Sequence, residues 1–261
     1  MRDRGHCSPA PPLVTKRAFA MTQDVPEFQF NDAALTLRQF LYEYWCAHGH
    51  GPNLRAAHEG TGLSRAAILD AYKQLDLGVI CVVDQETQNF NLLKVQPFSS
   101  FPSQVEVHVD GRFHCYAGCA LESIALSRMP PFAGKEIRLE SYCACCLAPV
   151  TISVRDGAVL AQTPEAVSIH ISSSPRDWNK TTIVPMCDSM NFVHDAAHAE
   201  RYERQIARRG VLVSLEQARR FVADTAANRM YRYDWPPVAV KPARILAGLK
   251  ALGVDLSNWG E

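Results

Sequence analysis

Hydrophobic positions between residues 31 and 96 first repeat with a helical period and then follow the shorter pattern of strands. The first apolar series recurs close to every 3.6 residues and stops at Gly49, which predicts an amphipathic helix. Ser64 stands where a helix N-cap is expected, before the third series. The order helix, short helix, helix and hairpin is typical of a winged helix-turn-helix, and these elements are predicted over 31–49, 53–60, 64–78 and 79–95.

The third predicted helix is poorly suited to contact DNA. Its basic residues are Arg65 and Lys73, and the same helix carries Asp70 and Asp76. The whole chain has 27 basic and 27 acidic residues, so no excess of positive charge favours nucleic acid. DNA is therefore disfavoured as a partner, and we predict a winged-helix-like domain, residues 31–96, that serves as a structural module.

A second domain is predicted after the Pro/Ser-rich segment 96–104. Alternating valines that turn at Asp110-Gly111 predict a hairpin, a helix follows "CALESIALSR", and further alternating segments predict more strands. Ser214 and Gln217 have the spacing of a capping box before a late amphipathic helix. The predicted fold class is α+β: an N-terminal winged-helix-like domain, then an antiparallel-sheet catalytic domain with flanking helices. The predicted bounds are 1–30 for a disordered tail, 31–96, 97–225, and 226–261 for a C-terminal extension without an assigned role.

The composition of the chain indicates its cellular location and the redox state of its cysteines. No segment approaches the 18 consecutive apolar residues of a membrane-spanning helix, and residues 1–20 lack the apolar centre of a signal peptide. The nine cysteines are odd in number and the chain is not small, which disfavours a disulfide scaffold. We therefore expect reduced thiols, a cytoplasmic location and no membrane partner.

Two cysteines and a glutamate suggest chemistry within "CYAGCALE". If a helix begins near Cys119, its free N–H groups and dipole favour the thiolate, and Glu122 lies one turn later on the same face. A partly desolvated carboxyl beside a thiolate should have a raised pKa and could act as a general acid. By itself this spacing is a weak signal, because a cysteine and a glutamate three apart often occur by chance at an ordinary buried helix start, which it favours.

Other cysteines and histidines leave alternatives open. Cys143 and Cys146 form a C-x-x-C pair that could bind zinc together with Cys115 and Cys119, although Cys145 and Cys146 could equally be small buried residues in a turn. A further pair, at 194 and 198, has the i, i+4 spacing of metal ligands, but the acidic residues beside it favour a solvated helix start.

Three segments, in this order, resemble the organomercurial (alkylmercury) lyase family. "YAGCALESI" is similar to the family's Tyr-Ala-x-Cys-Ala-Leu-Asp block. "GKEIRLESYCACCLAPVTISV" resembles its strand pair with Ser-x-Cys and Pro-Val. "MCDSMNFVHDAAHAERY" looks like its Cys-x-x-x-x-Phe segment with a one-residue insertion. The resemblance covers roughly residues 31–205.

The resemblance implies roles for individual residues. The family's two catalytic thiols, which bind mercury, fall on Cys119 and Cys187, and its structural cysteine falls on Cys143. Its catalytic aspartate falls on Glu122, where this chain departs from the pattern by one methylene. Cys115 is a candidate accessory thiol. The longer side chain moves the carboxyl by about 1 Å, a displacement that can cost on the order of 100-fold in rate.

The activity implied by the resemblance is protonolysis of a carbon–mercury bond. One thiolate captures the organomercurial, the second adds electron density, and the carboxyl protonates the carbon to give a hydrocarbon and Hg(II) bound by two thiolates. No organic cofactor is implied. External low-molecular-weight thiols or a mercuric reductase would take up the Hg(II). The alternative is a protein that sequesters mercury or copper, or a metal-responsive regulator, without lyase activity.

Overall fold

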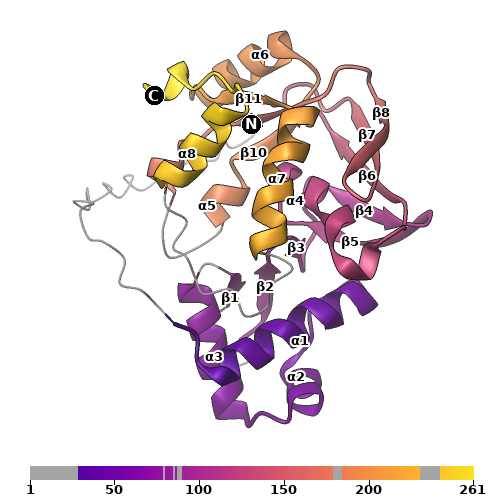
Figure 1. Cartoon of the computed structure of the whole chain (residues 1–261), viewed down its shortest axis with the longest axis vertical. Helices are drawn as coiled ribbons and strands as arrows, with labels where there is room; N and C mark the ends of the chain where they lie inside the picture. Colours follow the sequence, from indigo (N-terminus) through magenta and orange to yellow (C-terminus); the bar gives the residue numbers. More distant parts are fainter. Residues whose placement is uncertain (1–28, 79, 85, 87–89, 179–183, 230–241) are drawn as a thin grey trace, which may run out of the picture.

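Figure 1 presents the computed structural model of the chain, which describes residues 29–78, 80–84, 86, 90–178, 184–229 and 242–261. The three N-terminal helices lie at one end of the molecule, and the late helices with a small second sheet lie at the other. A large sheet connects the two ends. The predicted tail (1–30) falls almost entirely outside the described residues.

The N-terminal helices follow the hydrophobic periodicity of the sequence. They are α1 (Asp32–His48), α2 (Leu54–Thr61) and α3 (Arg65–Leu77). Their N-caps are Asn31, Asn53 and Ser64, and the side chain of each accepts the backbone N–H of the residue three positions later. A hairpin of β1 (Cys81–Val83) and β2 (Leu92–Val95) follows α3. The order of elements is as predicted, and their interpretation as a winged-helix-like domain stays a prediction.

The main sheet has eight strands, and every neighbouring pair is antiparallel. Its order is β1-β2-β3-β5-β4-β6-β7-β8. Strand β3 follows β2 directly and pairs with it, so the sheet is continuous across residues 96–97. The predicted α+β class with an antiparallel sheet is confirmed. The remaining bounds are β3 (Phe98–Ser99), β4 (Glu106–Val109), β5 (Arg112–Ala117), β6 (Ile137–Tyr142), β7 (Pro149–Arg155) and β8 (Ala158–Thr163).

The hairpin of β4 and β5 is closed by the turn that the sequence predicts. Asp110 and Gly111 both have positive φ angles, 49° and 79°, which suits a two-residue turn between twisted strands. Strand β5 then delivers the chain to the start of helix α4 (Ala120–Ala125). The local order strand, glycine, helix is therefore as expected around "YAGCALE".

A second sheet of three antiparallel strands packs beside the first, in the order β10-β9-β11. Helix α4 packs against strand β10 and against helix α7. The capping box before α7 is confirmed, since Ser214 and Gln217 exchange hydrogen bonds of 2.9 and 3.2 Å. The bounds are β9 (Ser168–Ile171), α5 (Val184–Cys187), β10 (Met190–Val193), α6 (Ala196–Ile206), β11 (Val211–Ser214), α7 (Leu215–Arg229) and α8 (Pro242–Ala251). Short 3-10 turns span Leu126–Arg128, Pro130–Phe132, Pro175–Asp177 and Ser257–Trp259.

One segment differs from its sequence pattern. The alternating residues before Cys187 predict a strand that leads into a loop, but Cys187 ends the short helix α5, and the strand β10 begins only at Met190. Residues 181–183 lie outside the described part of the chain. Because α5 is brief and precedes a tight turn, its apolar residues carry no helical repeat long enough to be recognised.

Aromatic packing fixes the N-terminal helices on the main sheet. The Trp45 ring of α1 stacks on Phe98 of β3 at 5.4 Å with 10° between the planes, and Tyr42 meets the same ring edge-on at 6.5 Å. All three side chains are buried. Since β3 also pairs with β5, this contact supports the strand that leads to Cys119.

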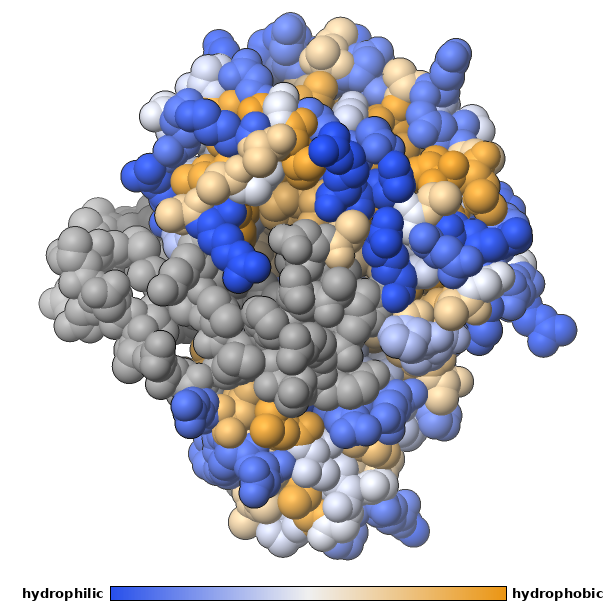
Figure 2. Space-filling model, viewed as in Figure 1, coloured by the Kyte–Doolittle hydropathy of each residue, from blue (hydrophilic) through white to orange (hydrophobic). Residues whose placement is uncertain are grey.

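The surface is mixed in character. Hydrophilic residues cover much of the described part of the face in Figure 2, interspersed with smaller hydrophobic areas. Among the described residues, no helix combines the length and the apolar composition needed to cross a bilayer.

Candidate active site

Cys119 lies at the junction of β5 and α4. Its backbone is extended, with φ −163° and ψ 174°, and it forms the N-cap of α4. The Cys119 sulfur accepts the backbone N–H of Glu122 at 3.4 Å. The predicted helix start is therefore correct, and the cap places the thiol and the first-turn carboxylate on one side of the helix.

Cys119, Glu122 and Cys187 converge in the interior. Their sulfur and carboxylate atoms all lie within 4.8 Å of one another, and all three residues are buried. The Cys187 thiol is 3.5 Å from Oε2 of Glu122, to which it donates. Two soft sulfur ligands and one carboxyl thus share a small buried site, although Cys187 is distant in the sequence and arrives on a different element.

The surroundings of Cys119 and Cys187 raise the pKa of both thiols. Burial raises the pKa of Cys119, and this outweighs the lowering by the Cys187 thiol and by the backbone N–H groups at the helix start. The backbone N–H groups at this N-cap do favour the thiolate, as expected, but burial has the larger effect. The pKa of Cys187 is raised well above the usual value, first because its thiol hydrogen-bonds to Cys119 and then because it is buried. The backbone N–H of Glu122, which the Cys119 sulfur accepts at 3.4 Å, favours the thiolate at this position.

A lysine adds positive charge beside the two thiols. Lys94 is buried on β2, and its Nζ lies 2.8 Å from the Asp188 carboxylate. Burial opposes the charged form, but the bond to Asp188 and the neighbouring Cys187 and Cys119 together raise the pKa of Lys94. In return, Lys94 lowers the pKa of Cys187. The lysine therefore favours loss of a thiol proton when mercury approaches.

Two further residues shape the site. The Met190 sulfur lies 3.8 Å from the Cys119 sulfur, which brings a third soft atom to the cluster. Gly118 faces the carboxylate: a Cβ built on Gly118 would be 2.4 Å from Oε2 of Glu122 and 3.4 Å from the carbonyl oxygen of Pro97. A side chain at position 118 would thus displace the Glu122 carboxylate from where it lies.

This geometry agrees with comparisons of known proteins. The model of the alkylmercury lyase (MerB) family matches residues 98–227. Residues 98–227 belong to the alkylmercury lyase family. Among solved structures, the mercury-bound form of MerB2 matches with a TM-score of 0.61 and 17% identity, covering 76% of this chain and 92% of that chain. No curated protein matches the chain in sequence. The predicted family is confirmed, and the exchange of aspartate for Glu122 stays a prediction.

The other predicted thiols of the alkylmercury lyase domain lie elsewhere. Cys115 is buried on β5 with Cys46 as its electrostatic neighbour, and it is not part of the cluster around Cys119. Its accessory role stays a prediction. All described cysteines are free thiols, and Cys7 lies outside the described residues. Cys143 is fully buried, as expected for the structural cysteine.

The suggested zinc set of four cysteines is wrong. The structure brings Cys143 and Cys146 next to His194 and His198, whose ligand atoms lie with theirs within 4.8 Å, and neither Cys115 nor Cys119 joins this group. The expectation of a solvated histidine pair is wrong too, because both rings are half-buried. Asp195 does cap α6 as a helix start requires, but the turn presents the rings to the cysteines.

The sequence analysis missed three residues of the site: Lys94, Gly118 and Met190. The signal for Lys94 was its position two residues after Leu92, on the same buried face of an apolar strand. Buried lysines are rare unless they are paired, so a lysine at such a position suggests a function. In the sequence, Gly118 has the properties of an ordinary turn glycine. Its role depends on the Glu122 carboxylate, which packs against it only in the folded chain. Met190 carried no signal, because a methionine in an apolar strand is usually a core residue.

Proposed function

We propose that the chain is an organomercurial lyase that cleaves carbon–mercury bonds with Cys119, Cys187 and Glu122. The observation that carries the proposal is the convergence of these three side chains, within 4.8 Å and buried, in a domain of the alkylmercury lyase family. Sulfur ligands select soft metals such as mercury over the hard cations that a carboxylate cluster would bind.

In this proposal Cys119 captures the substrate first. Its sulfur already accepts the backbone N–H of Glu122 at 3.4 Å, which favours its thiolate, whereas the Cys187 thiol donates its proton to Glu122. The Cys119 sulfur displaces the thiol ligand on the organomercurial, and the proton of Cys119 leaves with that ligand. The product of this step is an R–Hg–S bond to Cys119 inside a site that excludes water.

Cys187 and Glu122 then complete the cleavage. The Cys187 thiol passes its proton to Glu122 across the 3.5 Å contact, and its sulfur bonds to mercury. The Glu122 carboxylic acid delivers that proton to the carbon as the carbon–mercury bond breaks, so R–H leaves and Hg(II) stays on two thiolates. Glu122 ends as a carboxylate, the state in which it began, because the proton it received from Cys187 is now on the hydrocarbon. No organic cofactor takes part.

Low-molecular-weight thiols or a mercuric reductase would remove the Hg(II) in this scheme, which regenerates both thiols. Free thiols throughout the described chain suit a reducing compartment, and we place the reaction in the cytoplasm.

Methane release from methylmercury tests the proposal. With excess external thiol, the wild-type protein should produce methane, measured by gas chromatography, and Cys119→Ser or Cys187→Ser should reduce it to background. Glu122→Gln should bind methylmercury without turnover, because the amide cannot donate the acid proton. Cys46→Ser is the matched control, since this thiol is remote from the cluster, and it should retain activity.

The second candidate is a protein that sequesters soft metal ions. The same two thiols support it, because they could retain Hg(II) or copper(I) without any carbon–mercury cleavage. Stoichiometric metal uptake with no methane from methylmercury would favour this candidate and overturn the lyase proposal. A regulator that binds DNA is the less supported variant, given the few basic residues of α3.

A further inference from the structure

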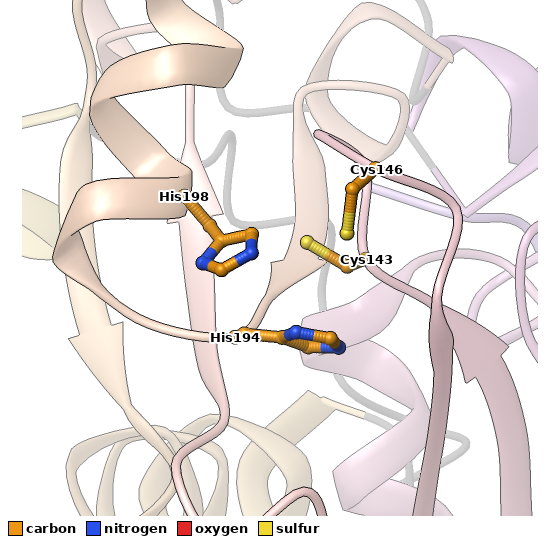
Figure 3. A group of neighbouring side chains, drawn as sticks. All are labelled: Cys143, Cys146, His194 and His198. Atoms are coloured by element: carbon orange, nitrogen blue, oxygen red, sulfur yellow. The ribbon is translucent and has the colours of Figure 1, made fainter.

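A second cluster of metal-binding side chains lies outside the catalytic one. Cys143, Cys146, His194 and His198 each offer a ligand atom, and these atoms all lie within 4.8 Å of one another. Figure 3 shows the two sulfur atoms and the two rings close together, from two separate segments of the chain. One segment is the turn between β6 and β7, and the other runs from the end of β10 into the first turn of α6.

The cysteine turn is shaped to bring two sulfur ligands together. The N–H groups of Cys146 and Leu147 both donate to the Cys143 carbonyl, at 3.3 and 2.8 Å, and Leu147 ends the turn with a φ of 62°. This turn places the sulfur atoms of Cys143 and Cys146 within 4.8 Å of each other. Zinc binds such cysteine pairs as thiolates.

The histidines are oriented for ligation as well. Nδ1 of His198 lies 2.8 Å from the Asp195 carboxylate, which leaves Nε2 for a metal in the arrangement that commonly orients metal-binding histidines. Nε2 of His194 is buried and has no hydrogen-bond partner within the described part of the chain. A buried nitrogen without a partner is costly, and a metal ion would satisfy it.

We propose that these four residues form a structural zinc site. Two cysteines and two histidines, as C-x-x-C and H-x-x-x-H pairs, make the tetrahedral ligand set that zinc takes in closed structural sites. The mixture of sulfur and nitrogen suits this borderline ion better than the all-sulfur sites that soft ions favour. Cys146 is exposed, which gives the ion a path of entry. The inference does not depend on the proposed lyase activity, because the catalytic thiols are separate from this cluster.

The site would fix strand β10 against the main sheet. Ala144, inside the cysteine turn, already donates a backbone bond of 2.9 Å to Phe192 of β10. Strand β10 begins at Met190, whose sulfur touches Cys119, and His194 directly follows its other end. A zinc ion there would stabilise the strand on which the catalytic cluster rests, without touching the substrate.

Metal analysis of the full chain tests the site. Purified without an affinity tag from zinc-containing medium, the protein should hold about one zinc ion per chain by mass spectrometry of the elements. Cys146→Ser and His198→Gln should lose it and melt at a lower temperature, since bound zinc stabilises the folded state. Cys145→Ser, in the same turn but outside the ligand set, should keep the zinc, as should the double variant Cys119→Ser/Cys187→Ser.

X-ray absorption at the zinc edge of the wild-type protein gives a second measurement that requires no variant to fold. It should show two sulfur ligands at about 2.3 Å and two nitrogen ligands at about 2.0 to 2.1 Å. A protein without stoichiometric zinc, zinc retained by Cys146→Ser, loss of zinc from the catalytic double variant, or a cluster that holds only mercuric ion would each overturn the proposal.

Discussion

Glu122 extends its carboxylate into the space beside Gly118 that any other residue would fill with its side chain. The distance from a Cβ at position 118 to Oε2 of Glu122 would be 2.4 Å, closer than nonbonded atoms approach. The resemblance to the lyases places an aspartate at position 122, and glutamate is one methylene longer. Gly118 gives the extra length room, so the two positions explain each other.

Gly118→Ala should therefore reduce activity through the carboxylate. The new methyl group forces Oε2 away from Cys187, and a displacement of about 1 Å in a reacting group costs roughly 10- to 100-fold in kcat. The Glu122 side chain can rotate, so the free energy of unfolding should change little. Methane release and urea denaturation of the same variant measure the two effects separately.

The control is a double-mutant cycle with Glu122→Asp. Aspartate withdraws the carboxylate from Gly118, so Gly118→Ala should have little further effect in that background. An equal loss of activity from Gly118→Ala in both backgrounds would show that the alanine acts through the backbone and not through the carboxylate.

The order of the two thiols can be read from single variants. Because the backbone N–H of Glu122 donates to the Cys119 sulfur and favours its thiolate, whereas the Cys187 thiol donates to Glu122, Cys119 should react first. Cys187→Ser should bind one methylmercury and release no methane, while Cys119→Ser should bind it at least tenfold more slowly. Native mass spectrometry over time detects both adducts. Equal capture rates in the two variants would contradict the assigned order.

Lys94 predicts a specific pH dependence. Its charge lowers the pKa of Cys187, so Lys94→Met should raise that pKa, and the acid side of the profile of kcat/KM against pH should move to higher pH. Activity at pH 7 should fall by about tenfold or more, with the deficit narrowing as the pH rises. The exposed Asp188 loses its partner at little cost, because water solvates it.

Lys135→Met is the matched control for this change of charge. Lys135 is an electrostatic neighbour of Cys46 and His114 and not of the catalytic thiols, so its removal should leave the profile in place. If the Lys94 variant lost activity equally at every pH, the lysine would act on the shape of the site and not on thiol acidity.

The sequence predicts the local half of the catalytic site from physical principles. Cys119 and Glu122 are one helical turn apart, so a predicted helix start suffices to place them together. Cys187 entered only through the family resemblance, because its approach depends on how α5 and β10 pack on α4. A spacing rule describes one element and carries no information about which distant element lies against it.

The second cluster shows the same limit. The pairs Cys143/Cys146 and His194/His198 were each visible as half of a metal site. Their meeting depends on the contact between the turn after β6 and strand β10, which belong to different sheets. The sequence around His194 and His198 favoured a solvated helix start. In the folded chain, tertiary packing places both half-buried rings against Cys143 and Cys146.

The hydrogen bond between Glu203 and His170 yields a prediction on stability. Nε2 of the buried His170 is 3.0 Å from Oε1 of Glu203, which also accepts the Gly210 N–H at 2.8 Å. Burial raises the pKa of Glu203, but these bonds outweigh it and lower the pKa below its usual value. A carboxylate with a lowered pKa stabilises the folded state above its unfolded pKa, and this contribution disappears as pH falls through the folded value.

Glu203→Gln should therefore lower the free energy of unfolding by about 1 to 2 kcal/mol at pH 7, a typical loss for a bond to a charged group. The difference from wild type should begin to shrink as the pH falls below about 4.3, the unfolded pKa, and should vanish only below the lowered folded pKa, where the glutamate is protonated in both states. Urea denaturation at several pH values measures it. Glu200→Gln, an exposed change on the same helix, should be neutral throughout. A deficit in Glu203→Gln that persists undiminished at low pH would mean that packing, and not the charge of Glu203, links α6 to the second sheet.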